Sequence, residues 1–340
     1  MKSKTALITG VSGQDGAYLS QLLIKKGYKV IGGERRSASN TFWRLKKLNI
    51  LNDIEIINLD ICEFSNIFDI VTNFKPDEIY NLAAQSFVGS SFNLPLVTSD
   101  STAIGATRIL ETLKKSKSDC KFYQASSSEM FGKVHETPQN EETKFYPRSP
   151  YAVSKVYAHM MTVNYRESYD MFCCCGILFN HESPLRGESF VTKKIVTNLV
   201  RIKQNLQEFM EIGNLDAKRD WGYAKDYVEA MHLMLQQKKA DDFVIATGKT
   251  FSVRYFIEKV CQLLEIDIEW RGKGKEEIGI NKKNNKTIVK VNPKFYRPAE
   301  VDYLLGDYTK AKKILSWEPK HNLDQLIEIM VNFELNDQNA

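Results

Sequence analysis

Short apolar runs alternate with longer amphipathic segments through the first half of the chain. Six runs are apolar nearly throughout, as expected of strands whose two faces are both covered: residues 5–9, 29–33, 54–59, 78–82, 121–125 and 171–179. The pattern predicts helices between them that begin near residues 17, 63, 97 and 150. Strands that alternate with helices are joined by right-handed crossovers. We therefore predict an α/β fold built on a doubly wound parallel sheet.

The rhythm changes after about residue 179. Charged loops are predicted at 181–189 and 216–226, while a helix at 226–237, a strand at 243–246 and a helix at 253–264 return to the first pattern. The stretch 271–290 is polar and contains three glycines, and we predict that it is a surface excursion. We expect a first domain at 1–180, with returning segments near 220–250. Residues 181–340 should mainly form a smaller C-terminal α/β substrate domain over the carboxyl edge of the sheet, where ligands of such sheets bind.

Composition excludes several classes of protein. With 43% hydrophobic and 26% charged residues, the 340-residue chain can build a large core and is neither disordered nor of low complexity. The net charge is only +5 and the two signs are interleaved, so nothing favours nucleic acid as a partner. No run approaches the roughly 18 apolar residues of a membrane span, and the apolar start at 5–9 is too short for a signal peptide. We expect a cytoplasmic protein.

Three of the six cysteines are consecutive, at 173–175, inside a predicted buried strand. Adjacent strand residues point to opposite faces, so these thiols cannot converge on one metal ion. We expect small buried side chains here and no metal site.

A glycine-rich loop links the first predicted strand to the first predicted helix. Gly10, Gly13 and Gly16 follow a G-x-x-G-x-x-G spacing. The first glycine allows a tight turn, the second lets a pyrophosphate approach the backbone, and the third lets the helix pack on the sheet. In this position the loop is typical of a Rossmann dinucleotide-binding site.

The ends of the following strands indicate which dinucleotide is bound. The second strand leads into Glu34, Arg35 and Arg36. An acidic residue there is common in NAD sites, but two guanidiniums can bind a 2′-phosphate through forked hydrogen bonds, so we predict NADP. Further cofactor contacts are expected where the third and fourth strands end, at Asp60, Ile61, Leu82 and Ala83.

A candidate catalytic group follows the fifth strand. Tyr151 and Lys155 lie four residues apart and share one face of a helix for which Ser149 is the predicted N-cap. A neighbouring ammonium favours the phenolate, which would make Tyr151 a usable base near neutral pH. Ser127 and Glu129 add a hydroxyl and a carboxylate at the same sheet edge. The set predicts oxidation of a secondary alcohol followed by a second proton transfer.

Seven strings of residues carry a family resemblance: 9–16, 77–86, 145–152, 163–169, 178–184, 219–222 and 296–301. Through them the chain resembles the extended short-chain dehydrogenase/reductase superfamily. Within that superfamily it is similar to the GDP-mannose 4,6-dehydratase family over nearly its whole length.

The resemblance implies roles for individual residues. It places the catalytic groups at Ser127, Glu129, Tyr151 and Lys155. It implies cofactor contacts at Gln14, Asp15, Arg35, Asp60, Gln85, Ser86, His181 and Arg186, and sugar-nucleotide contacts at Ser86, Asn180, Lys194, Arg219, Arg297 and Glu300. The implied reaction has three steps: C4 is oxidised by NADP with Tyr151 as base, water is lost across C5 and C6 with Glu129 as base, and the hydride returns to C6.

The exact substrate stays open. The family usually has threonine where Ser127 stands and tyrosine where Val97 stands, so GDP-manno-heptose is an alternative to GDP-mannose. A nucleotide-sugar epimerase of the same superfamily is a second alternative, which Glu129 disfavours because epimerisation needs no C5 base. A homo-oligomer, either a dimer or a tetramer, is expected.

Overall fold

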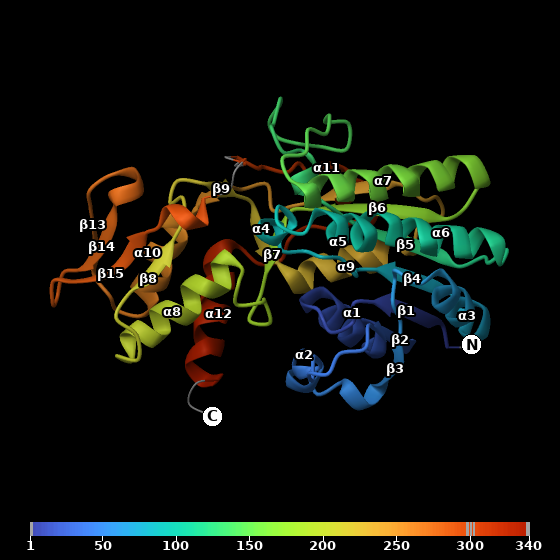
Figure 1. The fold of residues 1–340 in the computed structure, drawn as a ribbon, viewed down its shortest axis with the longest axis horizontal. Helices are drawn as coiled ribbons and strands as arrows, with labels where there is room; N and C mark the ends of the chain where they lie inside the picture. The colour runs from blue at the N-terminus through green and yellow to red at the C-terminus, as the bar shows by residue number, and fades with distance from the viewer. Residues whose placement is uncertain (1–2, 297–298, 300, 302, 338–340) are drawn as a thin grey trace.

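The computed structural model describes residues 3–296, 299, 301 and 303–337. Its larger part is a seven-stranded sheet in the order β11-β6-β5-β4-β1-β2-β3, in which every neighbouring pair is parallel (Figure 1). The strands are β1 (Thr5–Thr9), β2 (Lys29–Glu34), β3 (Ile54–Asn58), β4 (Glu78–Asn81), β5 (Lys121–Ser127), β6 (Cys173–Leu178) and β11 (Asp242–Ile245). The predicted doubly wound parallel sheet is confirmed, and each strand lies on a predicted apolar run.

Helices cover both faces of this sheet. One face carries α3 (Phe64–Phe74), α6 (Gly105–Lys115) and α7 (Pro150–Tyr169), and the other carries α1 (Gln14–Lys25) and α9 (Ala224–Leu235). Cys173 belongs to the core under α3 and α6, whereas Cys174 belongs to the core under α1 and α9. Adjacent cysteines therefore point to opposite faces, as predicted. Shorter helices complete the layers: α2 (Trp43–Lys47), α4 (Val88–Ser91), α5 (Pro95–Ser99) and α11 (Thr309–Leu315).

A second, smaller unit is built on a four-stranded sheet in the order β13-β14-β15-β8. Its strands are β13 (Ile268–Arg271), β14 (Ile278–Asn281), β15 (Lys286–Val291) and β8 (Met210–Ile212). Helices α8 (Val191–Lys203), α10 (Val253–Leu263) and α12 (Leu323–Asp337) pack together beside this sheet (Figure 1). The sequence analysis did not identify α8 or α12.

The prediction of a surface excursion at residues 271–290 is only partly right, because 271–276 and 282–286 are exposed but the stretch is not a loop. The stretch supplies β14 and most of β15, and Ile288 and Val289 are buried in the core of the smaller unit. Charged residues on the exposed side of the hairpin dominate its composition and hide the few apolar positions that pack inward.

Two short strand pairs lie between the units. β7 (Asn180–Glu182) pairs in parallel with β10 (Trp221–Tyr223), and β9 (Lys218–Arg219) pairs antiparallel with β12 (Phe251–Ser252). Because β7 follows β6 directly, the chain leaves the carboxyl edge of the large sheet at this junction, where ligands of open α/β sheets bind.

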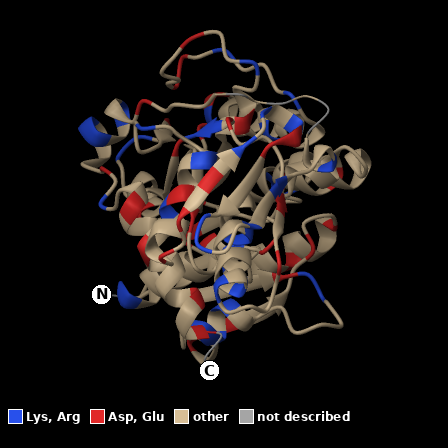
Figure 2. Cartoon of the chain, turned by 90° about the vertical axis from the view of Figure 1, so that its left-hand side faces the viewer, with Lys and Arg blue, Asp and Glu red and all other residues tan. Residues whose placement is uncertain are grey.

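Charges are mixed over the surface. Lysines and arginines are interspersed with aspartates and glutamates on the face shown in Figure 2. No helix within the described part of the chain is long and apolar enough to cross a membrane.

Candidate active site

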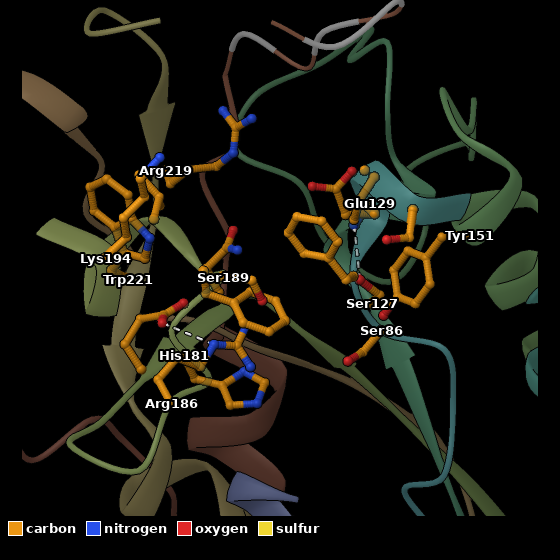
Figure 3. Close-up of a pocket in the computed structure, with 18 of the residues that line it drawn as sticks. Ser86, Ser127, Glu129, Tyr151, His181, Arg186, Ser189, Lys194, Arg219 and Trp221 are labelled. Atoms are coloured by element: carbon orange, nitrogen blue, oxygen red, sulfur yellow. Dashed lines mark hydrogen bonds and ion pairs between the residues drawn. The ribbon is translucent and has the colours of Figure 1, made fainter. Parts of the chain in front are cut away.

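A cavity of about 970 Å³ lies between the carboxyl edge of the large sheet and the smaller unit. Figure 3 shows its two walls. The first carries Ser127, Glu129 and Tyr151 and is called the catalytic wall after the role that the sequence predicts for them. The opposite one carries Lys194 and Arg219 and is called the nucleotide wall for the same reason. Residues predicted from both halves of the sequence therefore meet at one cavity.

The glycine-rich loop leaves no room for side chains at two of its glycines. Gly10 has a φ of +69°, and a Cβ there would lie 3.0 Å from the Cα of Ala83. A Cβ on Gly16 would lie 2.5 Å from the Gly10 carbonyl oxygen. Gly13, the N-cap of α1, has an ordinary φ of −70°. Backbone N–H groups at a helix N-terminus favour anions, so this tight loop fits the pyrophosphate of a dinucleotide.

Two residues that the resemblance links to the cofactor bind each other. His181 Nε2 lies 2.8 Å from Asp15 Oδ2, and His181 Nδ1 lies 2.7 Å from the carbonyl oxygen of Phe179. Both partners only accept hydrogen bonds, so the ring carries a proton on each nitrogen and is an imidazolium. Burial alone would lower the pKa of His181, but Asp15 raises it. Burial alone would raise the pKa of Asp15, but His181 lowers it to about 2.

Gln14 extends this contact. Its Nε2 donates to the carbonyl oxygen of His181 at 3.1 Å, and its Oε1 accepts from the Ser183 hydroxyl at 2.7 Å. The first turn of α1 is thereby tied to the segment that follows β6. The sequence placed Gln14, Asp15 and His181 near the cofactor but could not reveal that they bind one another across more than 160 residues of chain.

The two arginines predicted to select NADP follow β2 and are exposed. The backbone N–H of Arg36 donates to Asn58 Oδ1 at 3.1 Å, which fixes the turn that carries the pair. Glu34, the feature that would favour NAD, accepts a hydrogen bond from the Ser12 hydroxyl at 2.8 Å. Glu34 therefore has a role inside the protein, and both guanidiniums lie on the surface.

The sequence analysis missed Arg44, on α2. Its guanidinium donates to the carbonyl oxygens of Leu185 at 2.7 Å and Ser12 at 3.0 Å. Arg44 thus adds a positive charge beside the glycine-rich loop and links that loop to the segment leading into α8. In the sequence it is one of several cations in a short basic stretch, so nothing distinguished it from a surface arginine.

The remaining predicted cofactor residues lie beyond β3 and β4. Leu82 and Ser86 line the cavity, whereas Asp60 and Ile61 are not among the described residues that line it. Asp60 Oδ1 accepts from the backbone N–H of Cys62 at 2.9 Å, and Ile61 is buried. Ala83 packs against Gly10. The buried Oε1 of Gln85 has no hydrogen-bond partner among the described residues. It is an unused acceptor in a segment whose neighbouring residues line the cavity.

Helix α7 begins where the sequence predicts. The Ser149 hydroxyl accepts from the backbone N–H of Ala152 at 3.1 Å, and Pro150 is the first helical residue. Tyr151 and Lys155 are both buried one turn apart and line the cavity. The Ser127 hydroxyl at the end of β5 lines the same cavity and lowers the pKa of the Tyr151 phenol.

The predicted effect of Lys155 on that phenol is wrong. The Lys155 ammonium donates to the carbonyl oxygen of Ala125 at 2.6 Å and lies 5.7 Å from the centre of the Tyr151 ring. Burial raises the pKa of Tyr151 to about 12, although Ser127 and Arg186 oppose this rise. Burial also lowers the pKa of Lys155 to about 8. Helix spacing predicted the shared face, but the depth of burial depends on the elements packed around it.

Glu129 stands on the catalytic wall just beyond β5. It lies in a 3₁₀ turn, Ser128–Met130, where its backbone N–H donates to the Ser127 hydroxyl at 3.2 Å. Its side chain is buried, lines the cavity and opposes ionisation of Tyr151 through its negative charge. A carboxylate and a phenol therefore reach the cavity from one wall, as the sequence predicts.

The nucleotide wall collects cations and aromatic rings. Lys194 Nζ lies 3.5 Å from the centre of the Phe295 ring, and burial lowers the pKa of Lys194. Arg219 is buried and donates to the carbonyl oxygen of Lys218 at 2.9 Å. The buried Oδ1 of Asn180 has no hydrogen-bond partner within the described residues. Arg297 and Glu300, which the resemblance also links to the substrate, lie outside the described residues.

The sequence analysis also missed a polar face of α8. Besides Lys194, the cavity is lined by Thr197, Asn198 and Arg201. Their spacing of three, four and seven residues after Lys194 places them on one side of a helix. That periodicity was the available signal, but α8 itself was not predicted.

Comparisons with known proteins show which family the chain belongs to. A family profile described as GDP-mannose 4,6 dehydratase matches residues 7–330. The GDP-mannose 4,6 dehydratase of Dictyostelium discoideum is 49% identical over 96% of this chain and 95% of its own length. The protein of that name from Homo sapiens is 48% identical over 97% of this chain and 91% of its own length. The Vibrio cholerae relative is 48% identical over 98% and 94%.

Solved structures show the same fold at lower identity. A UDP-glucose 4-epimerase from Thermotoga maritima, solved with UDP-glucose, has a TM-score of 0.82 at 23% identity and covers 99% of this chain and 100% of its own. A dTDP-glucose 4,6-dehydratase from Bacillus anthracis, solved with NAD, has a TM-score of 0.82 at 19% identity and covers 99% of this chain and 98% of its own.

Proposed function

The chain belongs to the GDP-mannose 4,6-dehydratase family, and we propose that it converts GDP-mannose to its 4-keto-6-deoxy derivative with loss of one water. One observation carries the proposal. A phenol, an ammonium, a hydroxyl and a carboxylate share one wall of a cavity whose opposite wall carries two cations, Lys194 and Arg219, which suit a diphosphate.

A nicotinamide dinucleotide fits the large sheet. The crowded backbone at Gly10 and Gly16 suits a pyrophosphate, and the exposed Arg35 and Arg36, with Arg44 beside the loop, suit a 2′-phosphate. We therefore propose NADP as the cofactor. Bound in its oxidised form, it would accept the hydride from C4, and once reduced it would return that hydride to C6.

The first chemical step is assigned to Tyr151. Its phenolate takes the proton from the C4 hydroxyl as the C4 hydride is removed, which gives a ketone. Burial raises the pKa of Tyr151 to about 12, so the phenolate needs support, and the Ser127 hydroxyl and the Arg186 guanidinium provide part of it. Lys155, held on the Ala125 carbonyl, keeps a positive charge in the same layer.

The second step is assigned to Glu129. The C4 ketone acidifies the C5 hydrogen, which Glu129 removes as a proton. The C6 hydroxyl takes that proton from Glu129 and leaves as water, so a C5–C6 double bond forms. Hydride addition at C6 and protonation of C5, balanced by the proton that Tyr151 took from the C4 hydroxyl, complete the reaction, and the overall change is the loss of one water without net oxidation.

The two units divide the ligands in this proposal. The large sheet, residues 1–180 with the returning segments near 220–250, holds the cofactor, and residues 181–340 mainly hold the sugar nucleotide.

We also propose a homo-oligomer, because Leu96, Val97, Val153 and Met160 form an exposed apolar surface on α5 and α7, which pack together. Light scattering of the purified protein tests this, and a monomer at all concentrations would contradict it.

The test of the proposed function uses purified protein with NADP. GDP-mannose, GDP-manno-heptose and UDP-glucose are each incubated with it, and products are followed by mass. Loss of 18 mass units, the mass of one water, from GDP-mannose alone is expected. Preference for the heptose would change the substrate but keep the reaction, whereas unchanged mass with altered stereochemistry would identify an epimerase. Equal turnover of UDP-glucose would contradict recognition of guanine.

A further inference from the structure

One side of α7 repeats a contact with β5 at successive turns. Tyr151, Lys155 and His159 are spaced by four residues and so lie on one helix face. Lys155 donates to the carbonyl oxygen of Ala125 at 2.6 Å, and His159 Nδ1 lies 3.0 Å from the Ser126 hydroxyl oxygen. Tyr151, on the first of these turns, lies beside the next strand residue, Ser127, in the cavity (Figure 3). Two turns of the helix are therefore hydrogen-bonded to the two strand residues that come directly before Ser127.

The hydrogen bond to Ser126 is the main polar contact of the His159 ring within the described residues. The ring is 5% exposed, packs edge-on against Phe145 and lies near Cys175. Its Nε2 is 3.9 Å from Asp242 Oδ2, which is too long for a hydrogen bond. Within the described residues, Ser126 is the hydrogen-bond partner of the ring.

The carboxylate of Asp242, near His159, is bound by an arginine. Arg166, on the same helix, donates to Asp242 Oδ1 at 2.9 Å and to Oδ2 at 2.8 Å. This fork neutralises Asp242, so the cluster of His159, Cys175 and Asp242 is a poor metal site despite its compactness. Burial and Arg166 both lower the pKa of His159, while Asp242 raises it, and the net direction is downward. The ring is therefore a neutral hydrogen-bonding group and carries no charge into the core.

We propose that His159 and Ser126 form a clamp that sets the position of Ser127 against Tyr151, which makes His159 a positioning residue for proton transfer at the C4 hydroxyl. The proposal rests on the proposed function for the identity of that proton transfer. Among the described residues, His159 does not line the cavity. Its effect on the reaction must therefore be transmitted through the backbone of β5.

The position of Ser127 depends on that of Ser126, its neighbour in the strand. Ser126 and Ser127 are adjacent, so a shift of one moves the other, and misplacement by about 1 Å can cost a reaction as much as 100-fold. The Ser127 hydroxyl is one of the groups that lower the pKa of Tyr151, alongside Arg186, while Glu129 and Asp15 raise it. Loosening the clamp shifts the Ser127 hydroxyl relative to Tyr151, so it lowers the pKa of the phenol less and the phenolate forms at higher pH.

The experiment measures the first half-reaction. His159→Leu and Ser126→Ala remove the clamp from either side, and the double variant removes both. His159→Asn is the rescue, because its side-chain amide reaches about as far as Nδ1 and can either donate to or accept from the Ser126 hydroxyl. Tyr165→Phe is the matched control, since it removes a hydrogen bond of 2.7 Å from the same helix to Glu111 on α6, away from β5.

We expect a three- to tenfold slower reduction of the cofactor in His159→Leu and Ser126→Ala, as for loss of one neutral hydrogen bond in a transition state. The pH at half-maximal reduction should rise in both, the double variant should be no slower than the slower single, and His159→Asn should recover most of the rate. The KM for the sugar nucleotide should stay unchanged. Tyr165→Phe should keep the original rate and pH profile.

An equal loss of reduction rate in Tyr165→Phe, or additive losses of that rate in the double variant, would mean that His159 has only a structural role. A second readout does not need turnover: the ring nitrogen resonances of ¹⁵N-histidine protein should shift for His159 in Ser126→Ala and stay in place in Tyr165→Phe. An unmutated protein that does not act on a GDP-sugar would overturn the proposed function alone. Unchanged His159 resonances in Ser126→Ala would overturn the clamp alone.

Discussion

The two walls of the cavity hold their side chains in different ways. On the catalytic wall, neighbouring elements position the groups, because α7 binds the end of β5 through Lys155 and His159. On the nucleotide wall, α8, β9 and the turn Pro293–Phe295 each contribute residues from distant parts of the chain. That wall also keeps buried oxygens without partners among the described residues, at Asn180 and Thr197. In the proposed function, the closely held groups of the catalytic wall carry out the proton transfers, and the polar atoms of the nucleotide wall bind the sugar nucleotide.

The largest effect is expected on the catalytic wall at Tyr151. Tyr151→Phe removes the hydroxyl that takes the first proton, so reduction of the cofactor and overall turnover should both fall by about 10²- to 10⁴-fold. Stopped-flow absorbance of reduced nicotinamide, with calorimetry of sugar-nucleotide binding, measures this. Normal reduction in the variant would remove Tyr151 from the first step.

A second change on the same wall separates the two proton transfers. Glu129→Gln keeps the shape but removes the basicity, so turnover should also fall by about 10²- to 10⁴-fold. The cofactor should nevertheless become reduced when substrate is added, because Tyr151 and Lys155 remain. Single-turnover absorbance and deuterium uptake at C5 in heavy water report the two steps. Full turnover with normal uptake would assign the C5 proton to another residue, and loss of cofactor reduction would place Glu129 in the first step.

The nucleotide wall should respond in affinity. Arg219→Ala removes a buried guanidinium, and a charged hydrogen bond contributes about 1.5–3 kcal/mol, so the dissociation constant of the sugar nucleotide should rise by roughly 10- to 100-fold. The rate at saturating substrate should change by less than about threefold, and cofactor occupancy should stay constant. Arg219→Lys keeps the charge without the fork and should give an intermediate value. A loss confined to kcat would contradict the assignment of Arg219 to substrate binding.

The smallest effect concerns the Asp15–His181 pair between the two units. The pKa of His181 is raised by Asp15, so its contribution to stability is full below its unfolded pKa of about 6.5 and is lost as pH rises through the folded value. The contribution of Asp15, whose pKa is lowered to about 2, is lost only as pH falls toward that value. In cofactor-free protein, Asp15→Asn should therefore lower Tm by a few degrees near pH 6, with a smaller difference at higher pH.

Thermal melts across pH measure this, and Asp53→Asn, at an exposed aspartate, is the control. A Tm difference between Asp15→Asn and the unmutated protein that stays constant from pH 6 to pH 9 would mean that His181 is neutral. The two acceptors around its ring would then require another explanation.

Local pattern in the sequence determined much of the molecule. The apolar runs predicted the strands of the parallel sheet, and the spacing of Gly10, Gly13 and Gly16 predicted the dinucleotide loop. Ser149, Pro150 and the four-residue spacing of Tyr151 and Lys155 predicted where α7 begins and which face it presents. These features depend on residues close together in the chain, where hydrogen-bond geometry and side-chain period fix the outcome.

Only the tertiary structure decided the electrostatics and the contacts across the sheet. The sequence predicted a phenol made more acidic by Lys155, but burial raises the pKa of Tyr151 to about 12 and the ammonium binds the Ala125 carbonyl. The pairing of Asp15 with His181 and of Ser126 with His159, like the inward side of β15, joins residues far apart in the chain. A pKa depends on how much solvent is excluded and which charges lie within a few ångströms, and both are set by packing between elements rather than by neighbours in sequence.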